Sequence, residues 1–137
     1  AVLDICKWGA DDGDQKMKSR YYPHIDKAKV FGDHYVRDFS EHSRGVAVDV
    51  SLLYAKTGKP VDMGGHHDLL DPSSTTDSTL VTPSQRRNRM ILKTAFEKQG
   101  FANYAPEWWH YRLLNEPEPT LHYYFPVWDG MTSAGRP

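Results

Sequence analysis

An alternating apolar segment, GVAVDVSLLY, constrains the fold more than any other part of this sequence. Val46, Val48 and Val50 recur at every second position, and β-branched side chains of this kind are enriched in strands. The segment is therefore predicted to form a strand with the valines on one face. Asp49 then falls on the opposite face. A carboxylate turned toward a protein interior there would be costly unless it is paired or bound to a metal.

A helix with clear capping signals at both ends is expected downstream of this strand. Thr82 suits the N-cap, Pro83 suits the first helical position, and Gln85 completes a capping box. Gly100 is a natural residue for ending the helix. Between these signals, the apolar side chains at helical spacing, which should face the core, are Met90, Ile91, Ala95 and Phe96.

Two further strands are predicted near the C-terminal end. The stretches WWHYRLL (108–114) and LHYYFPV (121–127) are rich in aromatic side chains. The residues between them, NEPEPT, suit a turn that reverses the direction of the chain. A first helix is expected over residues 1–11. Because helices and strands follow one another without a regular βαβ order, we predict an α+β fold, a small antiparallel sheet flanked by helices.

The length and composition fit one domain and exclude some classes of partner. A chain of 137 residues fits a single domain over 1–137, in which 128–137 are expected to form a loose tail. The net charge of -1 gives no electrostatic reason to expect nucleic acid or a membrane as a partner. Cys6 is the only cysteine, so an intrachain disulfide is excluded and a cytoplasmic location is expected. The composition leaves the oligomeric state open.

His42 and Asp49 form a candidate metal site at the start of the predicted strand. Gly45 lets the backbone turn between them, so that both side chains can converge on one point. His110, far downstream, would add a second imidazole. Two imidazoles and one carboxylate suit a catalytic zinc, which takes three protein ligands and keeps a fourth position open. On spacing alone, however, such a pair is more often ordinary surface or core polarity.

Glu107 is the candidate general base. It lies three residues before His110, and Pro106 argues against a helix at this point. We therefore expect a bend at Glu107 that brings its carboxylate near a metal-bound water rather than onto the metal. The set would then be complete for metal-assisted hydrolysis, because zinc lowers the pKa of a bound water to about 7 and a nearby Glu can carry its proton to the leaving amine.

Two ordered motifs frame this candidate site. They have the patterns S-x-H-x-x-G-x-x-x-D and E-x-W-H, and they stand here as Ser40, His42, Gly45, Asp49 and as Glu107, Trp109, His110. Both motifs resemble those of the zinc D-alanyl-D-alanine dipeptidase (VanX-type) family. Other stretches similar to family segments are KSRYYPHIDK, TGKPVDMGGHHDLLD, RRNRMILKTAFEKQGF and YYFPV. The resemblance covers nearly the whole chain to Val127, and several ordered motifs rarely coincide by chance.

The resemblance implies a role for each matching residue. One zinc ion per chain would be bound by His42, Asp49 and His110. Glu107 would serve as general base and then as general acid while a metal-bound water attacks the peptide carbonyl of D-Ala-D-Ala. Asp68 falls at the family's position for the free ammonium group of this small dipeptide, with Ser40 nearby.

One family feature has no match in this sequence. The family also uses an arginine in a Tyr-Arg-Pro motif, which lies upstream of the segment that resembles AVLDICKWGAD, and Arg37, Arg44 and Arg136 do not match it. We therefore expect an N-terminal region to be missing, which keeps an export signal and a periplasmic location open. Two other functions also stay open: a related zinc D,D- or L,D-carboxypeptidase acting on peptidoglycan peptides, and a zinc-binding domain without catalysis.

Several other residues have ordinary structural interpretations. Trp108 and Trp109 could wall a closed pocket, but core packing is favoured for at least one of them. His66 and His67, adjacent in a glycine-rich loop, are expected to be exposed to solvent, and Cys6 is expected to be buried.

Overall fold

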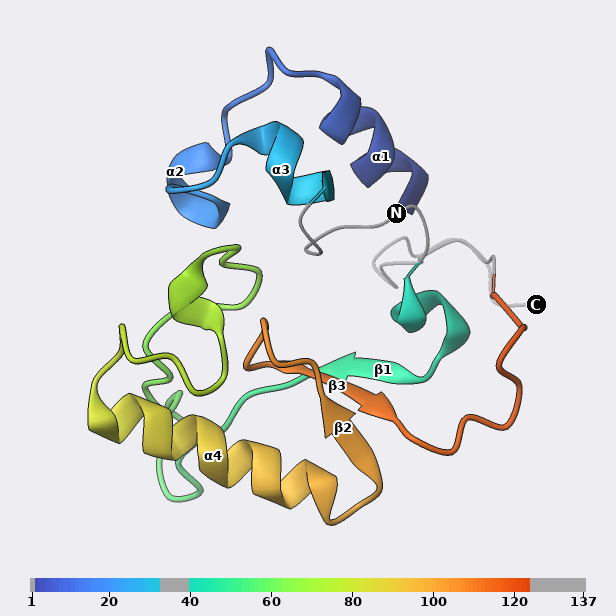
Figure 1. Cartoon of the computed structure of the whole chain (residues 1–137). Helices are drawn as coiled ribbons and strands as arrows, with labels where there is room; N and C mark the ends of the chain where they lie inside the picture. Colours follow the sequence, from blue (N-terminus) through green and yellow to red (C-terminus); the bar gives the residue numbers. More distant parts are fainter. Residues whose placement is uncertain (1, 33–39, 124–137) are drawn as a thin grey trace, which may run out of the picture.

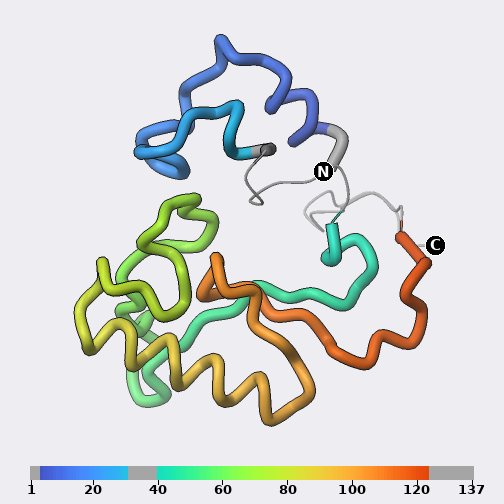
Figure 2. Tube along the Cα trace, viewed as in Figure 1, coloured from blue at the N-terminus to red at the C-terminus, as the bar shows by residue number. Residues whose placement is uncertain are grey.

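A three-stranded antiparallel sheet lies at the centre of the fold, which a computed structural model describes for residues 2–32 and 40–123 (Figure 1). The strands are β1 (Ala47–Asp49), β2 (Phe101–Asn103) and β3 (His110–Leu113), in the order β1-β3-β2. The segments that form β1 and β3 are far apart in the sequence but run side by side (Figure 2). The prediction of an α+β fold with a small antiparallel sheet is confirmed.

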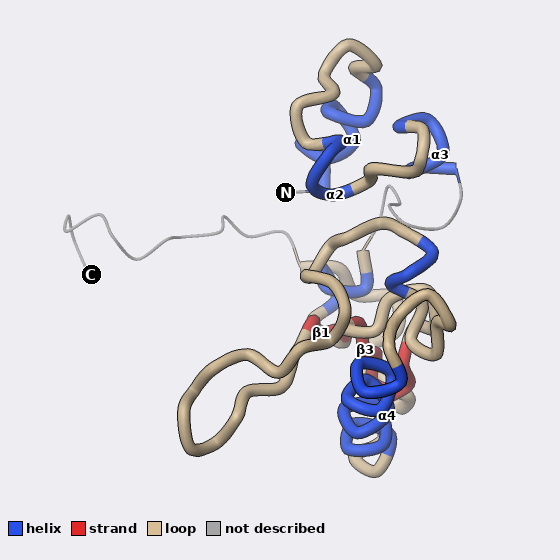
Figure 3. The backbone as a smooth tube through the Cα atoms, turned by 90° about the vertical axis from the view of Figure 1, so that its left-hand side faces the viewer, coloured by secondary structure: helices blue, strands red, loops and turns tan. Residues whose placement is uncertain are grey.

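The sheet separates two groups of helices. The short helices α1 (Val2–Ala10), α2 (Lys18–Tyr21) and α3 (Lys27–Gly32) gather at one end of the molecule, and the long helix α4 (Pro83–Glu97) lies at the other (Figures 1 and 3). Within the described parts of the chain, no helix is both long and apolar enough to cross a membrane.

The N-terminal helices pack around a buried lysine. The ammonium group of Lys27 donates to the backbone carbonyls of Asp11 and Asp14 and lies 4.3 Å from the centroid of the Trp8 ring. The backbone N–H of Leu70 donates to the carbonyl of Tyr21 at 2.6 Å, which fastens these helices to the loop before α4. Cys6 is only partly buried, so the expectation that it is buried was wrong.

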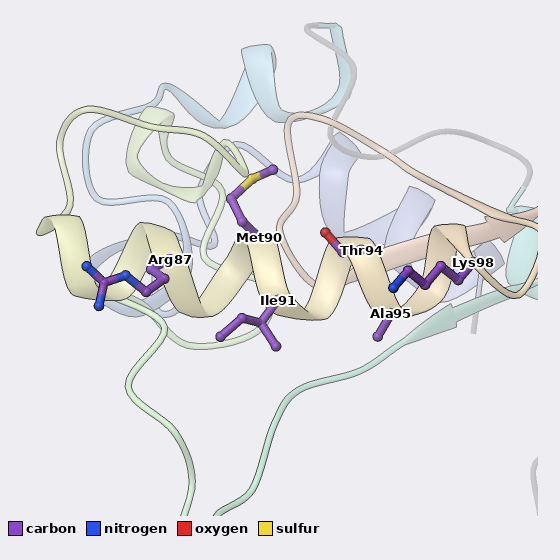
Figure 4. A pocket seen from close by; sticks show the side chains of 6 residues that line it. All are labelled: Arg87, Met90, Ile91, Thr94, Ala95 and Lys98. Carbon is purple, nitrogen blue, oxygen red and sulfur yellow. The ribbon is translucent and has the colours of Figure 1, made fainter.

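The α4 caps match the prediction, but its buried face matches only at Phe96, which is partly buried against the core. The Thr82 side chain accepts from the Gln85 N–H, and the Gln85 side chain accepts in return from the Thr82 N–H. The buried residues of α4 are Arg89 and Leu92, whereas Met90 and Ile91 are 39% and 54% exposed. Met90 and Ile91 instead line a shallow pocket on the outer face of α4, with Arg87, Thr94, Ala95 and Lys98 (Figure 4).

Arg89 turns inward because backbone carbonyls accept hydrogen bonds from two of its three guanidinium nitrogens, Nε and Nη1. It donates to the carbonyls of Met63, Ser73 and Thr75 at 2.6, 2.7 and 2.9 Å. Its burial lowers its pKa to about 10, so it stays charged at neutral pH. One side chain of α4 thus holds the loop that runs from residue 63 to residue 75.

The core lies between α4 and the sheet. Its buried members are Met63, Leu92, Trp108, Trp109 and Tyr111. Both tryptophans are therefore core residues, with exposed fractions of 2% and 1%. The backbone N–H of Trp108 also donates to the Ser74 carbonyl at 3.0 Å.

The first predicted strand is shorter than the alternating segment. Regular strand structure covers only Ala47–Asp49. Beyond it the chain stays extended, since the Val50 N–H donates to the Trp109 carbonyl at 3.0 Å and Leu53 forms an isolated bridge with Pro60. Val48 is 40% exposed, so the valines do not share one buried face. The reason is that β1 is an edge strand, whereas α4 packs against β2 at the other edge.

The C-terminal strands differ from the prediction in a related way. The strand within 108–114 is confirmed as β3, but residues 121–123 are irregular, and 124–127 and the tail 128–137 lie outside the described residues. The second partner of β3 is instead β2, which was not predicted. β2 follows α4 after Gly100, whose φ of 82° favours glycine and lets the chain reverse direction.

Replacing Arg89 by Leu should destabilise the fold strongly. The change leaves three carbonyl acceptors without their donor, and each such loss costs about 1–3 kcal/mol when the group is buried. We expect Arg89→Leu to lower the free energy of unfolding by at least about 3 kcal/mol in urea denaturation. Arg86→Leu, at an exposed position of the same helix, should change it by less than about 0.5 kcal/mol. Similar small losses in both variants would contradict this account of Arg89.

Candidate active site

The register of β1 and β3 brings two of the predicted metal ligands together. Asp49 and His110 are direct partners in this antiparallel pair, and His42 comes from the short 3-10 helix η1 (Glu41–Arg44) that leads into β1. His42 Nε2 lies 3.2 Å from His110 Nδ1, and Asp49 Oδ1 lies 3.5 Å from the first and 3.3 Å from the second. One nitrogen of each histidine and one carboxylate oxygen thus face a common point, as a metal site requires.

The turn before β1 is built by the first motif itself. The Ser40 side chain caps η1 by accepting from the His42 N–H at 3.2 Å. Gly45 ends η1 with a φ of 70°, a left-handed conformation that glycine adopts without strain. These two residues set the direction in which His42 leaves the backbone, as the prediction for Gly45 required.

A backbone carbonyl sets the tautomer of His42. Its Nδ1 lies 3.1 Å from the Ala47 carbonyl oxygen, which can only accept a hydrogen bond. Nδ1 must then carry the proton, and Nε2 is left with a free lone pair that points at Asp49 and His110. His42 is therefore arranged to offer Nε2 to a cation.

Glu107 lies at the predicted bend. It is located between two turns that precede β3, and its Oε2 is 3.6 Å from His110 Nδ1. The residue is only 8% exposed. Burial is the main cause that raises the pKa of Glu107 to about 7, with Asp49 and Asp68 adding to the effect and His110 opposing it. A carboxyl group with such a pKa can both accept and donate a proton near neutral pH.

His110 lies among carboxylates. Burial by itself would lower the pKa of His110, but the hydrogen bond that the ring donates to Asp49 and the charge of Glu107 outweigh burial and raise the pKa. Its Nε2, on the far side of the ring from Asp49, lies 3.6 Å from Glu41 Oε2. Sequence reasoning missed Glu41, whose only signal is its place between the serine and the histidine of the first motif.

Asn103 is a second residue that sequence reasoning missed. Its side-chain amide donates to the carbonyl oxygens of Glu107 and His110, both at 3.1 Å, and its own oxygen accepts from the Thr76 hydroxyl at 2.6 Å. The side chain thus spans the turn that separates the candidate base from a candidate ligand. Nothing local marks Asn103, because its partners become neighbours only when β2 pairs with β3.

Asp68 also lies near the candidate site. Its charge reaches Glu107, since it contributes to the raised pKa of that group. Its φ of 61° is the only positive value at a non-glycine residue among the described residues. Left-handed backbone of this kind is uncommon outside glycine and tends to cluster at functional sites.

The two adjacent histidines differ from each other. His66 is exposed, as expected, and its ring nitrogens lie 2.6 and 2.9 Å from the carbonyl oxygens of His67 and Arg20. His67 is partly buried, and its ring packs against Trp108 with centroids 5.3 Å apart. The expectation of exposure was therefore wrong for His67, whose ring covers the tryptophans.

The model of the D-ala-D-ala dipeptidase family (Peptidase_M15) matches residues 2–128. The chain belongs to this family. It is 42% identical over 127 residues to a D-alanyl-D-alanine dipeptidase of Streptomyces coelicolor, and 36% and 37% identical over the same length to proteins of that name from Enterococcus faecalis and Enterococcus faecium. These alignments cover 93% of the chain and 63% of each relative, so the chain spans less than two thirds of their length.

Membership of a metallopeptidase family implies a metal, and the donor set described above is chemically suited to one. Its three ligand atoms come from side chains that zinc commonly uses, and the tautomer of His42 already matches. Glu107 lies beside these three ligand atoms and is not one of the residues in the donor set.

The metal-free protein should lose stability as the pH rises through the range set by Glu107. The folded protein holds the Glu107 proton up to about pH 7, whereas the unfolded chain releases it near the ordinary value of 4.5. The unfolded state binds fewer protons in this window, so the free energy of unfolding falls with rising pH by up to about 3 kcal/mol.

Glu107→Gln removes this ionisation. In urea denaturation with a chelator present, the variant should match the wild type near pH 4.5 and exceed its free energy of unfolding by about 2–3 kcal/mol at pH 8. Glu118→Gln, at an exposed position, should show no such dependence. A difference between Glu107→Gln and wild type that does not change with pH would contradict the buried, proton-holding state of Glu107.

Proposed function

We propose that this chain is a zinc metallopeptidase that hydrolyses the dipeptide D-Ala-D-Ala. The relatives that support this proposal all carry the name D-alanyl-D-alanine dipeptidase. The proposed zinc ligands are His42, Asp49 and His110, with one zinc ion per chain. The proposed general base is Glu107, and the proposed substrate-binding residues are Asp68 and Ser40.

The spacing of the three donor atoms carries the proposal. In a tetrahedral zinc site with bonds of about 2.0–2.1 Å, simple geometry separates any two ligand atoms by about 3.3–3.4 Å. The three separations here are 3.2, 3.3 and 3.5 Å. Two nitrogens and one oxygen are therefore spaced as three ligands of a zinc ion would be, and a fourth position would stay open for water and substrate.

When bound, zinc supplies Lewis-acid chemistry, which polarises the scissile carbonyl and acidifies water. The protein supplies the proton carrier. Glu107 Oε2 lies 3.6 Å from His110 Nδ1, which puts the carboxylate beside the reaction centre and outside the proposed ligand set. From there Glu107 accepts a proton from the attacking water and donates it to the amine that leaves. Asn103 binds the carbonyls at both ends of the turn and so limits the movement of Glu107 relative to His110.

Asp68 supplies a negative charge for the free ammonium group of the substrate. A dipeptide carries its free ammonium group on the same residue as the scissile carbonyl, so a carboxylate close to the general base can bind this group. The charge of Asp68 is close enough to Glu107 to affect its pKa. A longer peptide that is cleaved before its C-terminal residue has no ammonium group at this distance, and Asp68 therefore favours a dipeptide over the substrates of a carboxypeptidase. Ser40, the other proposed substrate-binding residue, also holds η1 and His42 in place, since its hydroxyl accepts from the His42 N–H.

The direct test is D-alanine release from D-Ala-D-Ala by the 137-residue chain, with the zinc content measured on the same sample. We expect about one zinc per chain and turnover, and Glu107→Ala should keep the zinc while kcat falls at least about 100-fold. Glu118→Ala is the matched control. Loss of zinc from Glu107→Ala would contradict its assignment as a base.

The same assay separates the proposal from its alternatives. Release of D-alanine from longer peptides but not from the dipeptide would favour a carboxypeptidase, and bound zinc without turnover on either would favour a binding domain. A wild-type chain without zinc would overturn the proposal.

Asp68→Asn should weaken dipeptide binding while leaving zinc content unchanged. The variant loses an ion pair with the substrate's ammonium group, and a hydrogen bond to a charged group is worth about 1.5–3 kcal/mol. KM should therefore rise about 10- to 150-fold, with a smaller effect on kcat. Asp77→Asn, an exposed carboxylate in the same loop, is the control. An unchanged KM in Asp68→Asn would contradict the role of Asp68.

A further inference from the structure

Glu41 holds a position at the candidate site that none of the roles above uses. Its Oε2 lies 3.6 Å from His110 Nε2, while His110 Nδ1, on the other side of the ring, lies 3.3 Å from Asp49 Oδ1. The imidazole is thus placed between two carboxylates. One of them shares the proposed zinc site, and the other lies behind the ring.

Two arginines orient the Glu41 carboxylate by contacting its other oxygen, Oε1. Oε1 lies 3.5 Å from Arg44 Nη2 and 3.6 Å from Arg112 Nε. Because Oε1 faces both cations, Oε2 is directed at His110. Arg112 and His110 are two residues apart on β3, so their side chains leave the same face of the sheet and meet Glu41 together.

Arg44 is itself held firmly. Its guanidinium group forms two parallel contacts with the Glu116 carboxylate, Nε to Oε1 at 2.8 Å and Nη2 to Oε2 at 2.9 Å. The Arg44 side chain is only 14% exposed and that of Glu116 only 10%. Two short contacts of this kind, one of them a hydrogen bond, limit the movement of the guanidinium group. The series of side-chain contacts from Glu116 through Arg44 to Glu41 therefore leads to His110.

We propose that Glu41 is a positioning residue that binds the Nε2–H of His110 and so keeps Nδ1 free as the ligand atom. This inference rests on the proposed zinc site. Histidines that bind metals usually donate their other N–H to a carboxylate or a carbonyl, which fixes the tautomer and the ring orientation and makes the ligand more basic. His42 uses the Ala47 carbonyl in this way, and Glu41 provides the corresponding acceptor for His110.

A purely structural role for Glu41 makes a different prediction. Glu41 is the first residue of η1, and its contact with Arg44 is an i,i+3 pair. If stabilising η1 were its whole role, removing it would lower the free energy of unfolding without changing the zinc affinity of the folded protein. A positioning role predicts a loss of affinity in protein that remains folded.

The test is the zinc dissociation constant of the 137-residue chain, measured by competition with a chromophoric chelator. Glu41→Ala should weaken zinc binding about 10- to 100-fold. Glu41→Gln should have a smaller effect, because the amide oxygen can still accept the Nε2–H bond but carries no charge. Glu118→Gln, which removes a charge at an exposed position, should bind zinc as the wild type does.

A spectroscopic measurement on the same variants supports the affinity series and does not depend on catalysis. In zinc-loaded, 15N-labelled protein, the His110 Nε2–H proton should be visible and slow to exchange, and Glu41→Ala should remove or shift its signal. The Nδ1–H of His42, bound to the Ala47 carbonyl, serves as the internal control and should not move.

The outcomes separate this inference from the proposed function. If the wild type binds zinc and Glu41→Ala binds it within about twofold, with an unchanged His110 signal, the positioning role is wrong and the zinc site stands. If the wild type binds no zinc, the site and the positioning role are both wrong.

Discussion

The register between β1 and β3 is the constraint on which the candidate site depends. It places Asp49 opposite His110, and because side chains alternate across a strand, a slip of one residue would turn one of the two to the other face. Two features support this register: Tyr111 is anchored in the core beside Trp109, and the Val50 N–H donates to the Trp109 carbonyl. Gly45 then brings His42 onto the same side. Core packing and site geometry therefore depend on each other, because β3 carries both the proposed ligand His110 and the core residue Tyr111.

The turn that begins at Glu107 serves the core and the site at the same time. Trp108 and Trp109, directly between Glu107 and His110, are buried against α4 and the loop that Arg89 holds. The Glu107 carboxyl and the His110 imidazole that flank them lie 3.6 Å apart, and the two Asn103 hydrogen bonds close the turn. The burial that raises the pKa of Glu107 costs stability in the metal-free protein, and it is the same burial that suits this group to proton transfer near neutral pH.

Sequence reasoning reached those features whose physical cause is local. The Thr82–Gln85 capping box, the turn at Gly45 and the bend at Glu107 depend on neighbouring residues, and they appear as expected. The predictions failed for residues whose interaction partners are distant in the sequence. Arg89 is buried because distant carbonyls accept its hydrogen bonds, so the apolar pattern of α4 indicated the wrong positions except at Phe96. For the same reason β2, Asn103 and Glu41 could not be predicted, since each gains its meaning from pairing with β3 or from contact with its side chains.

Anomalous diffraction at the zinc edge, from a crystal grown with one equivalent of zinc, tests whether these three side chains hold one zinc ion. We expect a single strong peak bonded to His42 Nε2, Asp49 Oδ1 and His110 Nδ1, with Glu107 outside bonding distance. A peak elsewhere, such as beside His66, or a peak bonded to Glu107 in place of Asp49, would contradict it.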